Sequence, residues 1–240
     1  MPTLLLVRHG RSTANTAAVL AGWTPGVHLD DTGREQAAAL ARRVAPLPLA
    51  DVVVSPLERC QETAAALVAV DGPTGPRPAP RTDERLGECG YGDWTGRALK
   101  DLAKEPLWRT VQSHPSAAVF PGGEGLAAMQ HRALEAVREH DARIAAEHGD
   151  DAVWVAVTHG DVIKAVLADA LGMHLDLFQR LSADPCSVSV VRYAPLRPFV
   201  LRTNDSGGDL AGFAPPRRKR RAARRAVSSD AVVGGSTGAA

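Results

Sequence analysis

Aromatic residues and cysteines are scarce in this chain of 240 residues, and each shortage excludes a class of protein. Phe, Trp and Tyr make up only 4% of the sequence, so aliphatic side chains must supply most of any core. Three cysteines occur, Cys60, Cys89 and Cys186, without a Cys-x-x-Cys spacing. An odd number in this arrangement argues against a disulfide scaffold or a zinc knuckle and favours a reducing, cytoplasmic location.

Long apolar runs are missing as well. The apolar run at the N-terminus covers only Leu4 to Val7 and has no basic flank before it, which is too short for a signal peptide. No stretch approaches the ~18 apolar residues that a membrane span requires. We therefore expect a cytoplasmic protein without a membrane partner.

The formal net charge of +1 conceals two parts of opposite charge. Residues 217–225 (RRKRRAARR) hold seven of the 28 Lys and Arg residues, and the remaining 21 cations face 27 acids. After about residue 205 the chain is rich in Gly, Pro, Arg and Ser and has few residues that could build a core. We predict a folded domain over residues 1–205 and a disordered basic tail over residues 206–240.

Strand and helix patterns alternate along the folded part. Apolar strand patterns cover residues 3–7, 51–54 and 152–157, and a closing hairpin covers residues 187–193 and 199–202. Helical patterns cover residues 32–44, 57–68, 126–148 and 161–171, and Thr32 and Glu35 resemble a capping box. This alternation predicts an α/β fold, a three-layer α/β/α sandwich whose mostly parallel sheet has an antiparallel edge.

Two of the predicted strands end in the same short motif, RHG at residues 8–10 and THG at residues 158–160. Gly10 permits a sharp turn and a close approach of the backbone to a ligand. In open parallel sheets ligands bind beyond the carboxyl ends of the strands, so we expect His9 and His159 to share one site.

A cation in an unfavourable place adds a third signal. Arg59 falls in the first turn of the helix after Ser55-Pro56, where the helix dipole disfavours positive charge unless an anion lies in front of it. Glu88, in the turn-rich segment RLGECGYGDWTG, supplies a carboxylate. Its competitors for that role are Asp83, Glu84 and Asp93.

Each signal alone has a simpler interpretation. His9 could belong to a surface loop, Arg59 could be a solvated helix residue, and Glu88 could be one more exposed acid. Their coincidence favours an anion site. The six histidines without the strand-His-Gly pattern are interpreted as structural or surface residues: His28, His114, His131, His140, His148 and His174.

An ordered set of motifs runs over about the first 200 residues. It consists of VRHGRSTAN (7–15), LDDTGREQA (29–37), SPLERCQETA (55–64), LGECGYGDWTG (86–96), PGGEG (121–125) and VTHGDVIKAVL (157–167). The set resembles the histidine phosphatase superfamily (phosphoglycerate mutase-like, branch 1), and residues 88–193 also resemble actinobacterial proteins described as phosphomutases or acid phosphatases. The resemblance implies a sheet sandwiched by helices, no metal or other cofactor, a small phosphorylated substrate and a phosphohistidine intermediate.

The resemblance also implies roles for individual residues. His9 corresponds to the nucleophile, and Glu88 to the proton donor for the leaving alcohol, which would later take a proton from water. The groups expected around the phosphate are Arg8, Arg59, His159, Gly160, Ser12 and Asn15. Gly22 and Trp23 correspond to the substrate entrance. Because a carboxyl group must be protonated to act as an acid, we expect poor leaving groups to react best at mildly acidic pH.

Two positions depart from the family pattern. Arg11 stands where relatives often carry Glu or Gln, and it could face a second anionic group or the solvent. Gly160 follows His159 where one branch of the family has Asp, and Asp161 is predicted to cap its helix.

The sequence leaves several alternatives open. A phosphatase is favoured over a phosphomutase because the segment between Glu88 and His159 is short and lacks an adjacent arginine pair, although Lys100, Lys104, Arg109 and His114 could substitute for it. Residues 99–120 could form a lid or an ordinary cover of the core. In a third alternative the domain is a non-catalytic phosphate-binding module and the basic tail binds nucleic acid, which the acidic body does not favour. The substrate and the oligomeric state, including a homodimer, stay open.

Overall fold

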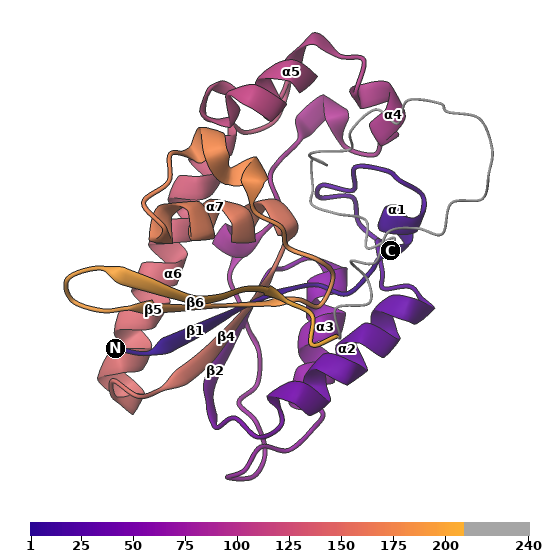
Figure 1. The fold of residues 1–240 in the computed structure, drawn as a ribbon. Helices are drawn as coiled ribbons and strands as arrows, with labels where there is room; N and C mark the ends of the chain where they lie inside the picture. The colour runs from indigo at the N-terminus through magenta and orange to yellow at the C-terminus, as the bar shows by residue number, and fades with distance from the viewer. Residues whose placement is uncertain (209–240) are drawn as a thin grey trace, which may run out of the picture.

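A six-stranded sheet forms the middle layer of the molecule (Figure 1). The computed structural model describes residues 1–208, so the predicted tail lies outside the described residues except for its first three. The strands are β1 (Thr3–Arg8), β2 (Leu49–Val54), β3 (Arg81–Thr82), β4 (Val153–Thr158), β5 (Val188–Tyr193) and β6 (Pro198–Asp205), in the order β3-β2-β4-β1-β5-β6. The first four run parallel, and β5 and β6 are antiparallel at one edge, which confirms the predicted sheet.

Helices cover both faces of this sheet. One face carries α2 (Asp31–Val44) and α3 (Glu58–Val68), and the other carries α6 (Leu126–His148) and α7 (Gly160–Ala170) (Figure 1). The shorter helices are α1 (Thr13–Thr16), α4 (Leu99–Leu102), α5 (Pro106–Ser113) and the 3₁₀ segments η1 (Glu84–Leu86), η2 (Gly92–Trp94), η3 (Pro115–Ala117) and η4 (Leu175–Arg180). The predicted three-layer α/β/α sandwich is therefore confirmed.

The apolar sequence of β1 explains why it lies inside the sheet. Leu4 and Leu6 are buried in the core beneath α6 and α7, while Leu5 and Val7 are buried in the core beneath α2 and α3. A strand covered on both faces needs apolar side chains at consecutive positions, because successive side chains point to opposite faces. Because both faces of β1 are buried, the strand ends close to where the apolar run stops, and His9 is the first residue after the strand.

The start of α2 differs from the prediction. The helix begins at Asp31, and the side chain of Asp30 caps it by accepting a hydrogen bond from the backbone N–H of Gly33 at 2.7 Å. The capping box predicted at Thr32 and Glu35 is therefore wrong. Asp30 is as good a capping residue as threonine, so the sequence alone could not fix the first residue.

Two glycines bring the N-terminus of α2 against the motif that follows β1. A Cβ atom added at Gly10 would lie 2.6 Å from the Gly33 carbonyl oxygen, and one added at Gly33 would lie 1.9 Å from the Arg11 carbonyl oxygen. The close approach that Gly10 permits is thus to the backbone of α2, in place of the ligand expected from the sequence. The packing of α2 therefore supports the backbone directly after His9.

A Gly33→Ala substitution is expected to lower the free energy of unfolding by about 1–3 kcal/mol, because backbone atoms must move to admit the methyl group. Urea denaturation measures the effect. Gly208→Ala is the matched control, since a Cβ there meets no atom within 4 Å. Equal stability of the two variants would contradict this account of the α2 contact.

Candidate active site

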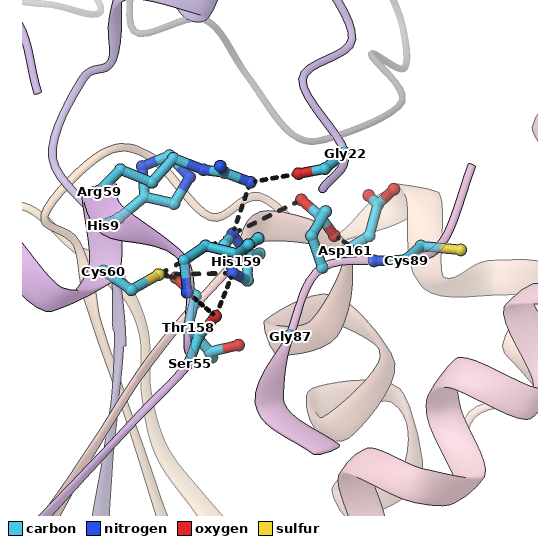
Figure 2. A network of polar contacts seen from close by, with 12 residues as sticks. His9, Gly22, Ser55, Arg59, Cys60, Gly87, Cys89, Thr158, His159 and Asp161 are labelled. Atoms are coloured by element: carbon cyan, nitrogen blue, oxygen red, sulfur yellow. Dashed lines mark hydrogen bonds and ion pairs between the residues drawn. The ribbon is translucent and has the colours of Figure 1, made fainter. Parts of the chain in front are cut away.

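Four side chains from distant parts of the sequence meet beyond the carboxyl ends of β1, β2 and β4. His9 follows β1, Arg59 lies in the first turn of α3, His159 follows β4, and Glu88 lies between η1 and η2. The ring centroids of His9 and His159 are 5.2 Å apart, and His159 Nδ1 lies 3.9 Å from Glu88 Oε2. All four are buried, and Figure 2 shows His9, Arg59 and His159 gathered around one point. The predicted convergence of these residues is found.

The ring of His9 is oriented by its own backbone. Its Nδ1 lies 2.7 Å from the Gly10 carbonyl oxygen, which can only accept a hydrogen bond, so Nδ1 carries the proton of the neutral ring. The lone pair is then on Nε2. Burial, and next the positive charges of Arg59 and Arg8, hold the pKa of His9 well below its usual range. The ring is therefore a neutral nucleophile over a wide range of pH.

Arg59 is a buried cation with spare hydrogen-bonding capacity. Its Nη2 donates to the Gly22 carbonyl oxygen at 3.0 Å and lies 3.3 Å from His159 Nδ1. Its Nη1 is buried without a hydrogen-bond partner among the described residues. A phosphate oxygen in front of the α3 N-terminus would satisfy this donor. The fully buried Arg8 donates from Nη1 to the Ala183 carbonyl oxygen at 2.7 Å and adds its charge to that of Arg59.

His159 is held by a residue that the sequence pattern did not single out as functional. Its Nε2 donates to Ser55 Oγ at 2.7 Å, and its Nδ1 accepts from Arg59. Burial first, and then Arg59 and His9, hold the pKa of His159 well below its usual range. Ser55 stands at the carboxyl end of β2, and that position was the only signal that could have identified it.

Glu88 has the environment of an acid catalyst. Burial, and next the negative charge of Asp161, raise the pKa of Glu88 to about 7. The backbone N–H of Cys89 donates to Oε1 at 3.0 Å and fixes the carboxyl group. A large share of Glu88 is therefore protonated near neutral pH and can donate a proton to a leaving alcohol.

Asp161 does not cap α7, which corrects the prediction. His159 holds the N-cap position, and Asp161 is completely buried. Its Oδ2 accepts from the Tyr91 hydroxyl at 2.8 Å, and its Oδ1 forms an ion pair with Lys164 Nζ at 2.9 Å. Because Asp161 is held in place close to Glu88, it sets the electrostatic environment of the acid. The sequence signal was its position two residues after His159.

Asp161→Asn is expected to lower the pKa of Glu88 and so to move the alkaline limb of the pH–rate profile to lower pH. The substitution also removes the counter-ion of Lys164 and could reduce the amount of folded protein. The pH at which the alkaline limb falls does not depend on that amount. Asp141→Asn is the matched control, since Asp141 is also buried but hydrogen-bonds Trp154 at 3.1 Å and is not among the charges that shift the pKa of Glu88. An unchanged limb in Asp161→Asn would contradict this role.

A narrow pocket leads to His9. Its described lining residues are His9, Ser12, Ala14, Asn15, Ala18, Val19, Leu20, Ala21, Gly22, Arg59, Glu88, Tyr91 and Leu99. Ser12 and Asn15 bond to each other, with Ser12 Oγ donating to Asn15 Oδ1 at 2.9 Å, so the amide N–H₂ group of Asn15 is the donor left for a ligand. Both residues thus lie where the sequence placed them.

Of the two predicted entrance residues, Gly22 lines this pocket and Trp23 does not. The indole of Trp23 is 41% exposed, donates to the Glu88 carbonyl oxygen at 2.6 Å and lines a separate hollow together with Arg132. Gly160 is buried at the start of α7. Arg11 is absent from the described lining of the pocket, and its partly exposed side chain is paired through Nε with Asp30 at 2.7 Å.

The segment over residues 99–120 packs as an ordinary cover. Trp108 stacks on Trp94 with ring centroids 6.1 Å apart, and Val111 and Phe120 are buried in the core. From this segment only Leu99 reaches the described pocket lining. The cations that could have replaced the arginine pair of a mutase lie outside that lining: Lys100, Lys104, Arg109 and His114.

Cys60 is not a second nucleophile. Its Sγ lies 3.4 Å from His159 Nε2, but burial raises the pKa of the thiol to about 12, so it stays protonated. Over residues 1–208, no cluster of three or more His, Cys, Asp and Glu side chains is placed to hold a metal ion. In the same part of the chain, no helix is both long and apolar enough to cross a bilayer.

One edge of the sheet holds a buried neutral histidine, a positively charged pocket that can bind an anion, and a protonated carboxyl group. Together these groups define an enzyme of phosphoryl transfer. The profile of the histidine phosphatase superfamily (branch 1) matches residues 4–206, and the chain belongs to this superfamily.

Similar proteins include both phosphatases and mutases. Phosphoserine phosphatase 1 of Hydrogenobacter thermophilus is 28% identical over 85% of this chain and 92% of its own. The glucosyl-3-phosphoglycerate phosphatase of Mycolicibacterium vanbaalenii is 32% identical over 72% of this chain and 76% of its own. A 2,3-bisphosphoglycerate-dependent phosphoglycerate mutase of Gloeobacter violaceus is 28% identical over 78% and 83%. The structure of YhfR from Bacillus stearothermophilus superimposes with a TM-score of 0.75 at 28% identity, covering 85% of this chain and 98% of the other.

Proposed function

We propose that the protein hydrolyses small phosphomonoesters without a metal, through a phosphohistidine formed on His9. The observation that carries the proposal is the state of His9, a neutral ring whose Nδ1–H is bound to Gly10 and whose Nε2 is left as the nucleophile. Two further observations support it: the Nη1 of Arg59 is buried without a partner among residues 1–208, and the pKa of Glu88 is raised.

The reaction proceeds in two displacements. In the first, His9 Nε2 forms a bond to phosphorus while the bond to the ester oxygen breaks, and protonated Glu88 gives its proton to that oxygen. Arg8 and Arg59 stabilise the charge on the equatorial oxygens, with the ring of His159 beside them. In the second, the Glu88 carboxylate takes a proton from water as the water attacks phosphorus, the P–N bond breaks and inorganic phosphate leaves.

Hydrolysis is favoured over phosphate transfer between hydroxyl groups. A mutase must keep phospho-His9 away from water and hold the doubly phosphorylated intermediate while it turns. The acidic intermediates of phosphoglycerate mutation also need cations for their carboxylate. Among the described residues that line the pocket, Arg59 is the one permanent cation, and it faces the phosphate site. The names of the relatives suggest phosphoserine, glucosyl-3-phosphoglycerate and 3-phosphoglycerate for a first substrate panel.

The proposal is tested by phosphate release from a panel of phosphomonoesters in the presence of a chelator, with isomer formation from 3-phosphoglycerate assayed in parallel. Release that EDTA leaves unchanged is expected. Isomer formation without release would identify a mutase, and neither activity over a broad panel would favour a non-catalytic binding module.

A chain ending at residue 205 is expected to release phosphate as fast as the full chain, because every residue named in the mechanism precedes that point. The same deletion should remove any salt-sensitive binding of DNA by the seven basic residues of 217–225. Loss of turnover on truncation would contradict the proposed division at residue 205. The cytoplasmic location remains a prediction from the sequence.

A further inference from the structure

The part of the pocket that receives the alcohol is uncharged. Beyond His9, Arg59 and Glu88, which act on the phosphate and the ester oxygen, most of the described lining is apolar: Ala14, Val19, Leu20, Ala21, Tyr91 and Leu99. The hydroxyl of Tyr91 is committed to Asp161 at 2.8 Å. The polar exceptions, Ser12 and Asn15, are neutral.

These apolar lining residues form a wall of the pocket, and backbone hydrogen bonds hold much of this wall together. The segment over residues 18–22 lies against residues 96–99. Leu20 N–H donates to the Arg97 carbonyl oxygen at 3.0 Å, Gly96 N–H donates to Leu20 at 2.7 Å, and Leu99 N–H donates to Ala18 at 3.0 Å. The Gly22 carbonyl oxygen is taken by Arg59. Since these groups bond to one another, the leaving alcohol meets mainly apolar side chains.

Three cations close in sequence to the lining residues are paired with acids. Arg11 is paired with Asp30, Arg97 with Glu105, and Lys104 with Asp101. Lys100 follows Leu99 on α4 but is exposed and does not line the pocket. A substrate carboxylate placed against these side chains would therefore be desolvated without a cationic partner among residues 1–208, and it would lie near Glu88, which itself carries charge above its pKa.

We infer that the protein prefers phosphomonoesters of small uncharged alcohols with an apolar part, and that it discriminates against esters that carry a carboxylate beside the phosphate. The inference rests on the proposed hydrolase function. It separates this chain from relatives named for phosphoserine and phosphoglycerate substrates, each of which contains a carboxylate.

Matched substrate pairs test the inference. Propyl phosphate is compared with 3-phosphonooxypropanoate, and glycerol 1-phosphate with 3-phosphoglycerate, by kcat/KM at pH 6 with the full chain. The uncharged member of each pair is expected to react at least about tenfold better. A ratio near one, or a preference for the acid, would overturn the inference.

Variants of the wall add a gain-of-function arm. Leu99→Arg is expected to raise kcat/KM for the acidic member of each pair and so to reduce the ratio of the two kcat/KM values. Leu99→Met is expected to leave this ratio unchanged. Lys100→Met is expected to change neither member. A selective loss of the acidic substrate in Lys100→Met would show that a cation does serve the alcohol site, and would also overturn the inference. If Leu99→Arg does not fold, Val19→Arg with Val19→Met provides the same comparison.

Different results would contradict the inferred substrate class and the proposed hydrolase function. Phosphate release that favours carboxylate-bearing esters contradicts the substrate class alone. No release from any pair, or from p-nitrophenyl phosphate, contradicts the hydrolase function on which it rests.

Discussion

His9→Ala is expected to reduce phosphate release by at least about 10³-fold. Without the ring there is no Nε2 to accept the phosphoryl group, and the nearby Cys60 cannot replace it because its thiol stays protonated. The rate of release from the best substrate of the panel, measured at saturating and at limiting concentration, checks the expectation.

The matched control for this substitution is His131→Ala. His131 lies on α6 with an exposed side chain and pairs with Glu135, so its loss removes a histidine without touching the pocket. Wild-type turnover is expected there. Comparable activity in His9→Ala and His131→Ala would remove His9 from the mechanism.

Glu88→Gln is expected to lower kcat/KM for an alkyl phosphate by about 10²–10⁴-fold, while an aryl phosphate with a good leaving group loses far less. An alkoxide is a poor leaving group and needs the proton of Glu88, whereas a nitrophenolate leaves without it. The ratio kcat/KM reports the first displacement and so separates the acid role of Glu88 from its later role as a base. Equal losses on both substrates would assign Glu88 to phosphate binding instead.

The same carboxyl group sets the alkaline limit of the reaction. Glu88 acts as an acid only while it is protonated, and its pKa is raised to about 7, so kcat/KM for the alkyl phosphate should fall about tenfold per pH unit above that value. The pKa of His9 is held well below its usual range, so the nucleophile stays neutral into the acidic range. A flat profile between pH 4 and 8 on the alkyl phosphate would contradict the assignment.

The catalytic residues could be predicted from sequence because they follow strands. A strand buried on both faces has a continuous apolar sequence, so its end is visible, and parallel strands bring their ends to one edge. That reasoning placed His9 and His159 at one site, and the unfavourable position of Arg59 in the first turn of its helix added the arginine. The motif order narrowed the acid to Glu88 among four candidates.

The supporting residues could not be predicted, because their roles depend on contacts between distant segments. Ser55 hydrogen-bonds His159, which lies 104 positions further along the sequence, and Tyr91 hydrogen-bonds Asp161, which lies 70 positions further. No local sequence pattern indicates either pair. The orientation of the Trp23 side chain could not be predicted either, because its indole is held by a hydrogen bond to the backbone carbonyl of Glu88. Gly10 was correctly read as a site of close approach, but which backbone approaches it depends on the tertiary fold.

The apolar wall of the pocket could not be predicted from the sequence for a different reason. Ala18 to Ala21 carry no distinctive motif, and they matter only because hydrogen bonds to residues 96–99 place them over His9. Residues 99–120 offered a lid and a core cover as alternatives, and the stacking of Trp108 on Trp94 favours the cover. Substrate selectivity therefore depends on tertiary contacts to a greater degree than the catalytic groups do.

The central claim is a covalent phosphoenzyme on one nitrogen of one histidine, and trapping that species tests it most directly. The protein is mixed with substrate, quenched in alkali within milliseconds, digested and examined by mass spectrometry, with phosphorus NMR to identify the substituted nitrogen. Phosphate on Nε2 of His9 is the predicted result, because Nδ1 donates its hydrogen to Gly10. Turnover without a phosphohistidine, or phosphate on another residue, would contradict the account.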